Sequence, residues 1–139
     1  MNAALSPTLY ALTGFAGWTL ILMLIMTTNR MLNSFGGPKI PMNKFSATGE
    51  DLPGFGQRVT RAHLNCLENL PVFAALVAAT MLSGQFGVME NTAMYVLYAR
   101  IAQSVVHLIS ASLPMVLVRG SFFFIQVVLM GWYACQLLF

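Results

Sequence analysis

The stretch AALSPTLYALTGFAGWTLILMLIMTTN, residues 3–29, contains no Asp, Glu, Lys or Arg. A helix that crosses a bilayer needs about 20 consecutive, mainly apolar residues, and this stretch exceeds that length. It also exceeds the roughly 7–15 apolar residues of a signal-peptide core, and no cation precedes it. We therefore predict a membrane-spanning helix here and do not expect it to be cleaved as a signal.

The whole chain shares this scarcity of charge. Of its 139 residues, 58% are hydrophobic and 8% are charged, with seven Lys and Arg against four Asp and Glu. A soluble domain averages roughly 25% charged residues, and a disordered chain combines low hydrophobicity with high charge. The composition excludes both classes and indicates a small integral membrane protein.

Three further hydrophobic segments follow the first. Residues 69–89 and 121–139 carry no charge, and residues 91–114 carry a single cation, Arg100. We predict an all-α membrane protein with one domain over residues 1–139, an antiparallel bundle of four transmembrane helices. The expected helices cover about 5–29, 57–83, 91–112 and 116–138, with an irregular loop at about 30–56. Pro114 is expected to end the third helix.

The positions of the cations predict the orientation of the bundle. Lys and Arg are enriched in cytoplasmic loops, and they occur around the first and third connections but not between residues 83 and 90: Arg30, Lys39, Lys44, Arg58 and Arg119. Both termini are then non-cytoplasmic, in a bacterial inner membrane or an endomembrane. The net charge of +3 reflects this topology, and since no basic run with interleaved aromatics occurs, we expect no nucleic-acid partner.

Two polar stripes cross the hydrophobic segments. The second segment begins GQRVTRAHLNCLENLPVF, in which the spacing of three, four and three residues places four side chains on one helical face: Arg58, Arg61, Asn65 and Glu68. His63 and Cys66 lie off that face. In the third segment Arg100, Gln103 and His107 share a face in the same way. Ionisable residues inside a membrane are rare and commonly functional.

The stripes allow a structural and a functional interpretation. Glu68 could neutralise Arg61 or Arg100 in an internal ion pair, while Arg30 and Arg119 extend to the interface. One carboxylate cannot neutralise two guanidinium groups, however, so an anionic ligand is a reasonable partner. Guanidinium groups bind carboxylates in pairs of hydrogen bonds and lower the pKa of a nearby thiol. This inventory suits glutathione, although other zwitterionic anions would also match it.

Other sites find less support in the sequence. Cys66 and Cys135 are expected near opposite membrane faces, so we predict no disulfide, and no Cys or His spacing indicates a metal. A haem held by His63 and His107, or proton-coupled export through Glu68, would fit a chain of this size. The first needs both histidines to face one cavity, and the second needs a carboxylate without arginine neighbours.

The segment RVTRAHLNCLENLPVF resembles the signature of the MAPEG family, the membrane-associated proteins of eicosanoid and glutathione metabolism. The family pattern is roughly R-x-x-R-A-x-x-N-x-x-E-x-x-P, and all six of its positions match in register: Arg58, Arg61, Ala62, Asn65, Glu68 and Pro71. Length, four hydrophobic spans and the long first loop extend the resemblance over essentially the whole chain.

The resemblance implies a homotrimer of four-helix protomers that binds glutathione between protomers near the cytoplasmic face. It implies glutathione contacts by Arg30, Arg61, Asn65, Glu68, Arg100, Gln103 and His107, and activation of the thiol by Arg119 as the catalytic residue. The eicosanoid enzymes often carry Tyr at the position of His107, and some carry Tyr or His at the position of Gln103, so both residues depart from that pattern.

The activity implied is that of a transferase or peroxidase. It would use glutathione as co-substrate and act on hydrophobic small molecules from the bilayer, either lipophilic electrophiles or lipid hydroperoxides. The alternative is a non-catalytic scaffold of the same family that binds lipid or glutathione.

Overall fold

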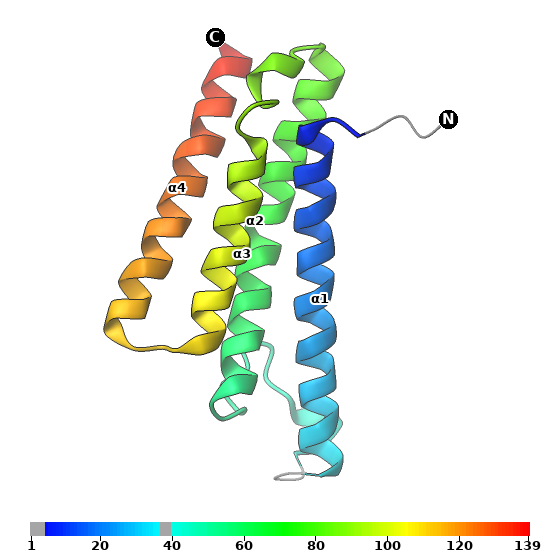
Figure 1. Cartoon of the computed structure of the whole chain (residues 1–139). Helices are drawn as coiled ribbons and strands as arrows, with labels where there is room; N and C mark the ends of the chain where they lie inside the picture. The colour runs from blue at the N-terminus through cyan, green and yellow to red at the C-terminus, as the bar shows by residue number, and fades with distance from the viewer. Residues whose placement is uncertain (1–4, 37–39) are drawn as a thin grey trace.

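The computed structural model describes residues 5–36 and 40–139, which form an antiparallel bundle of four α-helices (Figure 1). The helices are α1 (Pro7–Phe35), α2 (Phe55–Ser83), α3 (Ala93–Ile109) and α4 (Leu113–Leu138). The predicted all-helical, four-helix class is confirmed. The start of α1 and the end of α4 lie at the same end of the bundle. Lys39, one of the cations behind the predicted orientation, lies outside the described residues.

The first helix begins where its sequence predicts and ends later. Ser6 precedes it, and the Ser6 hydroxyl accepts a hydrogen bond of 3.3 Å from the backbone N–H of Leu9, while Pro7 occupies the first turn. The helix continues past the expected end at residue 29 to Phe35. Arg30 therefore lies inside the helix. The expected boundary was wrong because it followed the first cation, and arginine is a good helix former.

The third helix is shorter than expected. It covers Ala93–Ile109 instead of residues 91–112, so at 1.5 Å per residue it is about 26 Å long, less than the roughly 30 Å of a hydrocarbon core. The other three helices are long and apolar enough to cross a membrane. The break occurs at Ser110, whose backbone is extended and whose hydroxyl accepts from the N–H of Ser112 at 3.1 Å.

Pro114 does not end α3 as predicted. It lies in the first turn of α4, where a proline is well tolerated because the N–H that it lacks would have had no partner inside the helix. The helix break therefore precedes the proline and leaves a link of only three residues, 110–112, between α3 and α4.

The connection between α1 and α2 is shorter in sequence than the predicted loop, which was expected to cover about 30–56. It covers residues 36–54 and contains one short 3-10 helix, Met42–Lys44. Gly49 has φ +73°, and a Cβ at this position would lie 2.8 Å from Cβ of Thr60. A glycine is therefore required both for the turn and for the close packing of this connection on α2.

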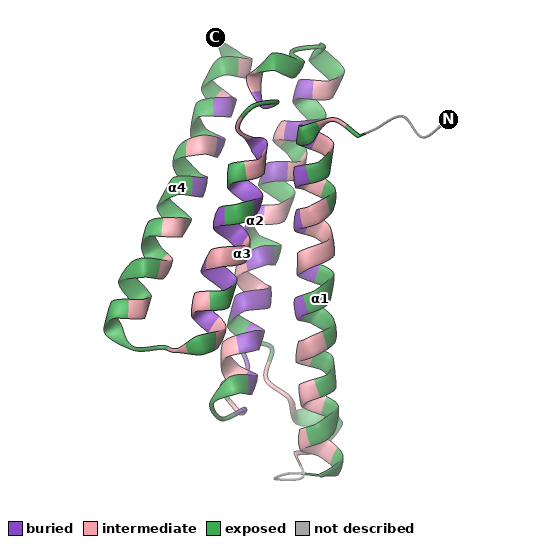
Figure 2. Ribbon diagram, in the orientation of Figure 1, coloured by how far each residue is buried: buried purple, intermediate pink, exposed green. Residues whose placement is uncertain are grey.

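The core lies along the inner faces of α1, α2 and α3 (Figure 2). Phe15 of α1 and Phe73 of α2 are fully buried, with ring centroids 6.0 Å apart. Gly14 allows α1 to approach α3 closely, since a Cβ there would lie 2.7 Å from Cδ2 of Leu97. Large apolar side chains cover much of the outer surface, as expected of helices that face lipid.

The fourth helix is the least buried of the four. Only Gln126, Met130 and Tyr133 of α4 are buried, all on the side that packs against α3. Tyr133 donates a hydrogen bond of 2.9 Å from its hydroxyl to that of Thr92, which joins the end of α4 to the start of α3. Besides this bond, extensive packing along α3 and a smaller contact with α2 hold α4 in place.

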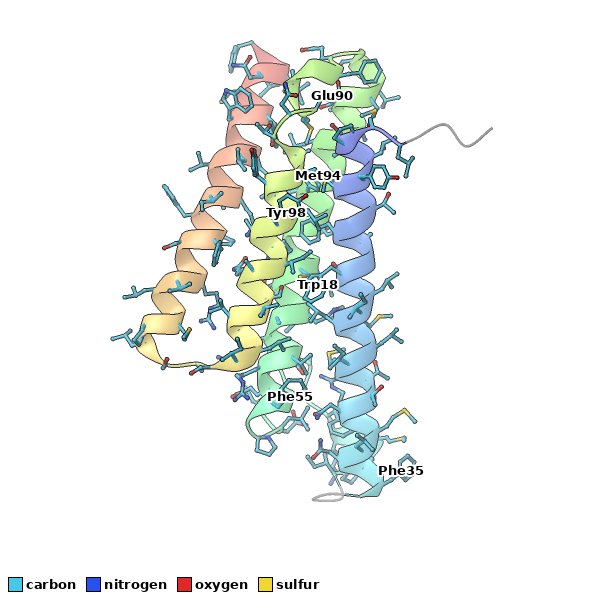
Figure 3. All side chains as sticks on the ribbon, viewed as in Figure 1. Trp18, Phe35, Phe55, Glu90, Met94 and Tyr98 are labelled. Carbon is cyan, nitrogen blue, oxygen red and sulfur yellow. The ribbon has the colours of Figure 1, made fainter. Side chains whose placement is uncertain are left out.

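We expect Tyr133→Phe to lower the free energy of unfolding by about 0.6 kcal/mol, and by no more than about 1.7 kcal/mol, since hydrogen bonds between membrane helices have this size. Thermal unfolding of the detergent-solubilised protein measures the change. Tyr98→Phe is the matched control, because Tyr98 lies exposed on α3 (Figure 3). Equal unfolding temperatures for the two variants would contradict a stabilising role for the Tyr133 hydroxyl.

Candidate functional site

Polar side chains gather around two adjoining pockets lined by residues of α2, the second half of α3 and the start of α4. One pocket has a volume of about 280 Å³ and is lined by Arg61, Leu64, Asn65, Glu68, His107 and Arg119. The other has about 290 Å³, and besides apolar residues it is lined by Asn65, Glu68, Gln103 and Arg119. Three residues, Asn65, Glu68 and Arg119, line both pockets, so the two form one site.

The α2 stripe supplies one wall of this site. Arg61 and Glu68 are exposed on the surface of the protomer, and Asn65 lies half-buried between them. Arg58, the first residue of the stripe, has another role: its Nε donates to the backbone carbonyl of Leu108 at 2.9 Å. Carbonyls in the last turn of a helix lack partners within the helix. Arg58 thus stabilises the end of α3 next to His107.

The α3 stripe is buried along its whole length. Gln103 and His107 each line one of the pockets, whereas Arg100 lines neither and is 1% exposed. Nη1 of Arg100 donates to Oδ1 of Asn65 at 3.0 Å and to its backbone carbonyl at 3.3 Å. The guanidinium carbon also lies 5.2 Å from the ring centroid of Phe15. Arg100 therefore supports Asn65 from behind the site.

The ion-pair interpretation does not describe Arg100. Its Nη1 atom is bonded to Asn65, and its Nε and Nη2 atoms have no hydrogen-bond partner among the described residues. Glu68 is exposed and lines both pockets, where it is the only carboxylate. The carboxylate is thus placed to interact with a ligand in the pockets.

The fourth helix contributes Arg119 and a residue that the sequence analysis missed. Arg119 is partly buried in the second turn of α4 and lines both pockets. Gln126 is fully buried, and its Nε2 donates to Oε1 of Gln103 at 2.9 Å. Gln126 follows Arg119 by seven residues and so shares its helical face. The seven-residue spacing between Arg119 and Gln126 is therefore the feature of the sequence that could have placed Gln126 on the same face as Arg119.

Arg30 does not join these residues in the four-helix bundle. Its Nη2 donates to the backbone carbonyl of Ser46 at 2.9 Å, and its guanidinium carbon lies 5.6 Å from the ring centroid of Phe45. It lines a separate pocket of about 250 Å³, formed by α1 and the α1–α2 connection together with Thr27, Met31, Ser34, Met42 and Phe45.

His63 and Cys66, which lie off the α2 stripe, are buried in the core. Sγ of Cys66 is 3.7 Å from the hydroxyl of Ser104, and Cys66 and Cys135 are both free thiols. His107 lines a pocket and buried His63 does not, so the two histidines do not face a common cavity in the manner that a haem requires. Within residues 5–36 and 40–139, no group of three or more His, Cys, Asp or Glu side chains could hold a metal ion.

The comparison with known families covers all of these residues. The MAPEG family model matches residues 8–139, nearly the entire chain. No curated protein and no solved structure gives a significant match. The match agrees with the signature that runs from Arg58 to Pro71 and with the four-helix membrane fold. The chain therefore belongs to the MAPEG family, the membrane-associated proteins of eicosanoid and glutathione metabolism.

Proposed function

We propose that this protein is a glutathione-dependent membrane transferase or peroxidase that acts on lipophilic electrophiles or lipid hydroperoxides. The observation that carries the proposal is the lining of the two adjoining pockets, which combines two guanidinium groups, one carboxylate and two side-chain amides. Glutathione offers the complementary groups: two carboxylates, an ammonium group and a thiol.

Each charged group of the site has a proposed contact. Arg61 binds a glutathione carboxylate, since a guanidinium can form two parallel hydrogen bonds with it. Glu68 accepts from the ammonium group. Arg119, on α4, lines both pockets and stabilises the thiolate form of the sulfur. Asn65 and Gln103 add neutral hydrogen bonds.

The proposed reaction begins with loss of the thiol proton to solvent. The thiolate attacks an electrophilic carbon, a sulfur–carbon bond forms, and the leaving group departs with its electron pair. With a hydroperoxide, the sulfur attacks the terminal oxygen, a sulfur–oxygen bond forms and the O–O bond breaks. The sulfur is oxidised to a sulfenic acid, and the peroxide is reduced to an alkoxide that takes up a proton and leaves as the alcohol. Arg119 favours both routes because it raises the share of thiolate at neutral pH.

A second copy of the chain would complete the site. Arg61 and Glu68 are exposed, so a single protomer leaves their side of the pockets open. We propose a homotrimer that binds glutathione between protomers near the cytoplasmic face. Since Arg30 lies on α1 and lines a different pocket of its own protomer, we assign its contribution to the site of a neighbouring copy.

An apolar pocket next to the polar site could hold the lipophilic substrate. It has a volume of about 490 Å³ and is formed by side chains of α3 and α4, among them Tyr95, Ala99 and Phe122. Phe122 is next in sequence to Phe123, which lines the polar site. We propose that substrates partition from the bilayer into this pocket and meet the sulfur near Arg119.

We expect Arg61→Ala to weaken glutathione binding about 10- to 100-fold, because a hydrogen bond to a charged group contributes about 1.5–3 kcal/mol. Titration calorimetry on the detergent-solubilised protein measures the dissociation constant. Lys44→Ala is the control, since it removes a cation from an exposed position in the α1–α2 connection. Absence of binding by the wild-type protein would refute the proposal.

We expect Arg119→Ala to abolish the ultraviolet absorbance of the thiolate on addition of glutathione and to slow conjugation to an aromatic halide about 100-fold, as loss of one charge-stabilising donor does. Binding of glutathione should persist. A wild-type protein that binds glutathione without thiolate formation or turnover would select the non-catalytic scaffold, an alternative favoured by the departure of Gln103 and His107 from the pattern of the eicosanoid enzymes.

A further inference from the structure

The two side-chain amides that line the site have a polarity that decides which ligand they prefer. An amide presents two N–H donors at one end and an accepting oxygen at the other. Asn65 and Gln103 could each turn either end toward a ligand. The orientation follows from partners that can only donate or only accept, and both amides have such a partner behind the site.

Asn65 is oriented by Arg100. A guanidinium only donates, so the Asn65 oxygen, at 3.0 Å from Nη1 of Arg100, must face the core. Nδ2 of Asn69 also approaches this oxygen, at 3.5 Å. The amide nitrogen of Asn65 is therefore turned away from Arg100. Since Asn65 lines both pockets, its N–H groups are available there.

Gln103 is oriented through Gln126. Nε2 of Gln126 donates to the backbone carbonyl of Phe122 at 2.8 Å, and a backbone carbonyl only accepts, so the nitrogen end of Gln126 is fixed. The same nitrogen donates to Oε1 of Gln103 at 2.9 Å. The oxygen of Gln103 thus faces Gln126, and its amide nitrogen is left for the pocket that Gln103 lines.

We propose that Gln126 is a positioning residue that fixes Gln103 with its N–H donors toward the ligand. Together with Asn65, which Arg100 orients, Gln103 then selects for a ligand atom that accepts hydrogen bonds: an anionic or carbonyl oxygen, or a thiolate. This inference rests on the proposed binding of glutathione. Gln126 is fully buried, lines neither pocket and acts only through Gln103.

A purely structural role for Gln126 makes a different prediction. Amides often join membrane helices by hydrogen bonds, and the Gln103–Gln126 bond could serve only to hold α4 against α3. In that case either single replacement would break the bond and weaken binding, whereas Gln126→Glu, which keeps a hydrogen bond to Gln103 when the Gln103 amide turns round, would bind glutathione about as well as the wild type. If Gln126 acts through Gln103, its replacement has no further effect once the Gln103 amide is gone.

The experiment is a double-mutant cycle on the glutathione dissociation constant of the detergent-solubilised full chain. It compares Gln126→Met, Gln103→Met and the double variant with the wild type. Gln136→Met is the matched control, since it makes the same change at an exposed position of α4. Gln126→Glu is a second variant of nearly the same shape, in which oxygen replaces the amide nitrogen.

We expect Gln126→Met to weaken glutathione binding about 3- to 10-fold, as loss of one neutral hydrogen bond does, and to have no effect in the Gln103→Met background. Gln126→Glu should weaken binding more than Gln126→Met, because it draws the N–H groups of Gln103 away from the ligand. If wild type binds, then additive losses, a Gln126→Met protein that binds like Gln136→Met, or a Gln126→Glu protein that binds better than Gln126→Met would overturn the inference. Failure of wild type to bind would instead overturn the proposed function and this inference with it.

Discussion

Among the residues that the structure describes, Arg100 has the largest fully buried side chain, and its guanidinium contacts an amide and an aromatic ring. A charge inside a membrane bundle is costly unless polar groups surround it. The hydrogen bonds from Arg100 to Asn65 join α3 to α2. The contact between the guanidinium and the ring of Phe15 joins α3 to α1 as well. The hydrogen bond that Nη1 of Arg100 donates to Asn65 also turns the oxygen of Asn65 inward, so the packing of the core and the chemistry of the pocket wall are coupled.

The same principle extends to the least buried helix. α4 packs extensively on α3 but buries few side chains, and one of its contacts, between Gln126 and Gln103, is again a polar bond behind the pocket. Both amides of the site therefore take their orientation from partners in the interior. The pocket wall that results is rich in donors, with Glu68 as its only carboxylate. This asymmetry favours a ligand that is mainly anionic and carries one cationic group.

The sequence predicted most of the α2 and α3 surfaces because helical periodicity converts residue spacing directly into a shared face. Arg61, Asn65 and Glu68 could be grouped in this way, as could Gln103 and His107. Helix ends were less accurate. The first helix passes through Arg30, since a cation at the membrane interface does not interrupt a helix, and the third ends at Ser110 before the proline that was expected to break it. Gln126 was overlooked because it lies in a segment without charge.

By itself, the sequence determined the membrane class, the four helices and the MAPEG family, because charge density, apolar length and a local signature are all properties of the linear chain. Only the tertiary structure decided which polar residues meet. Within a protomer it brings Arg119 to the α2 stripe, places Arg100 behind Asn65 and leaves Arg30 at a separate pocket. The reason is physical: periodicity specifies the face of one helix, whereas the neighbour of that face depends on how all four helices pack.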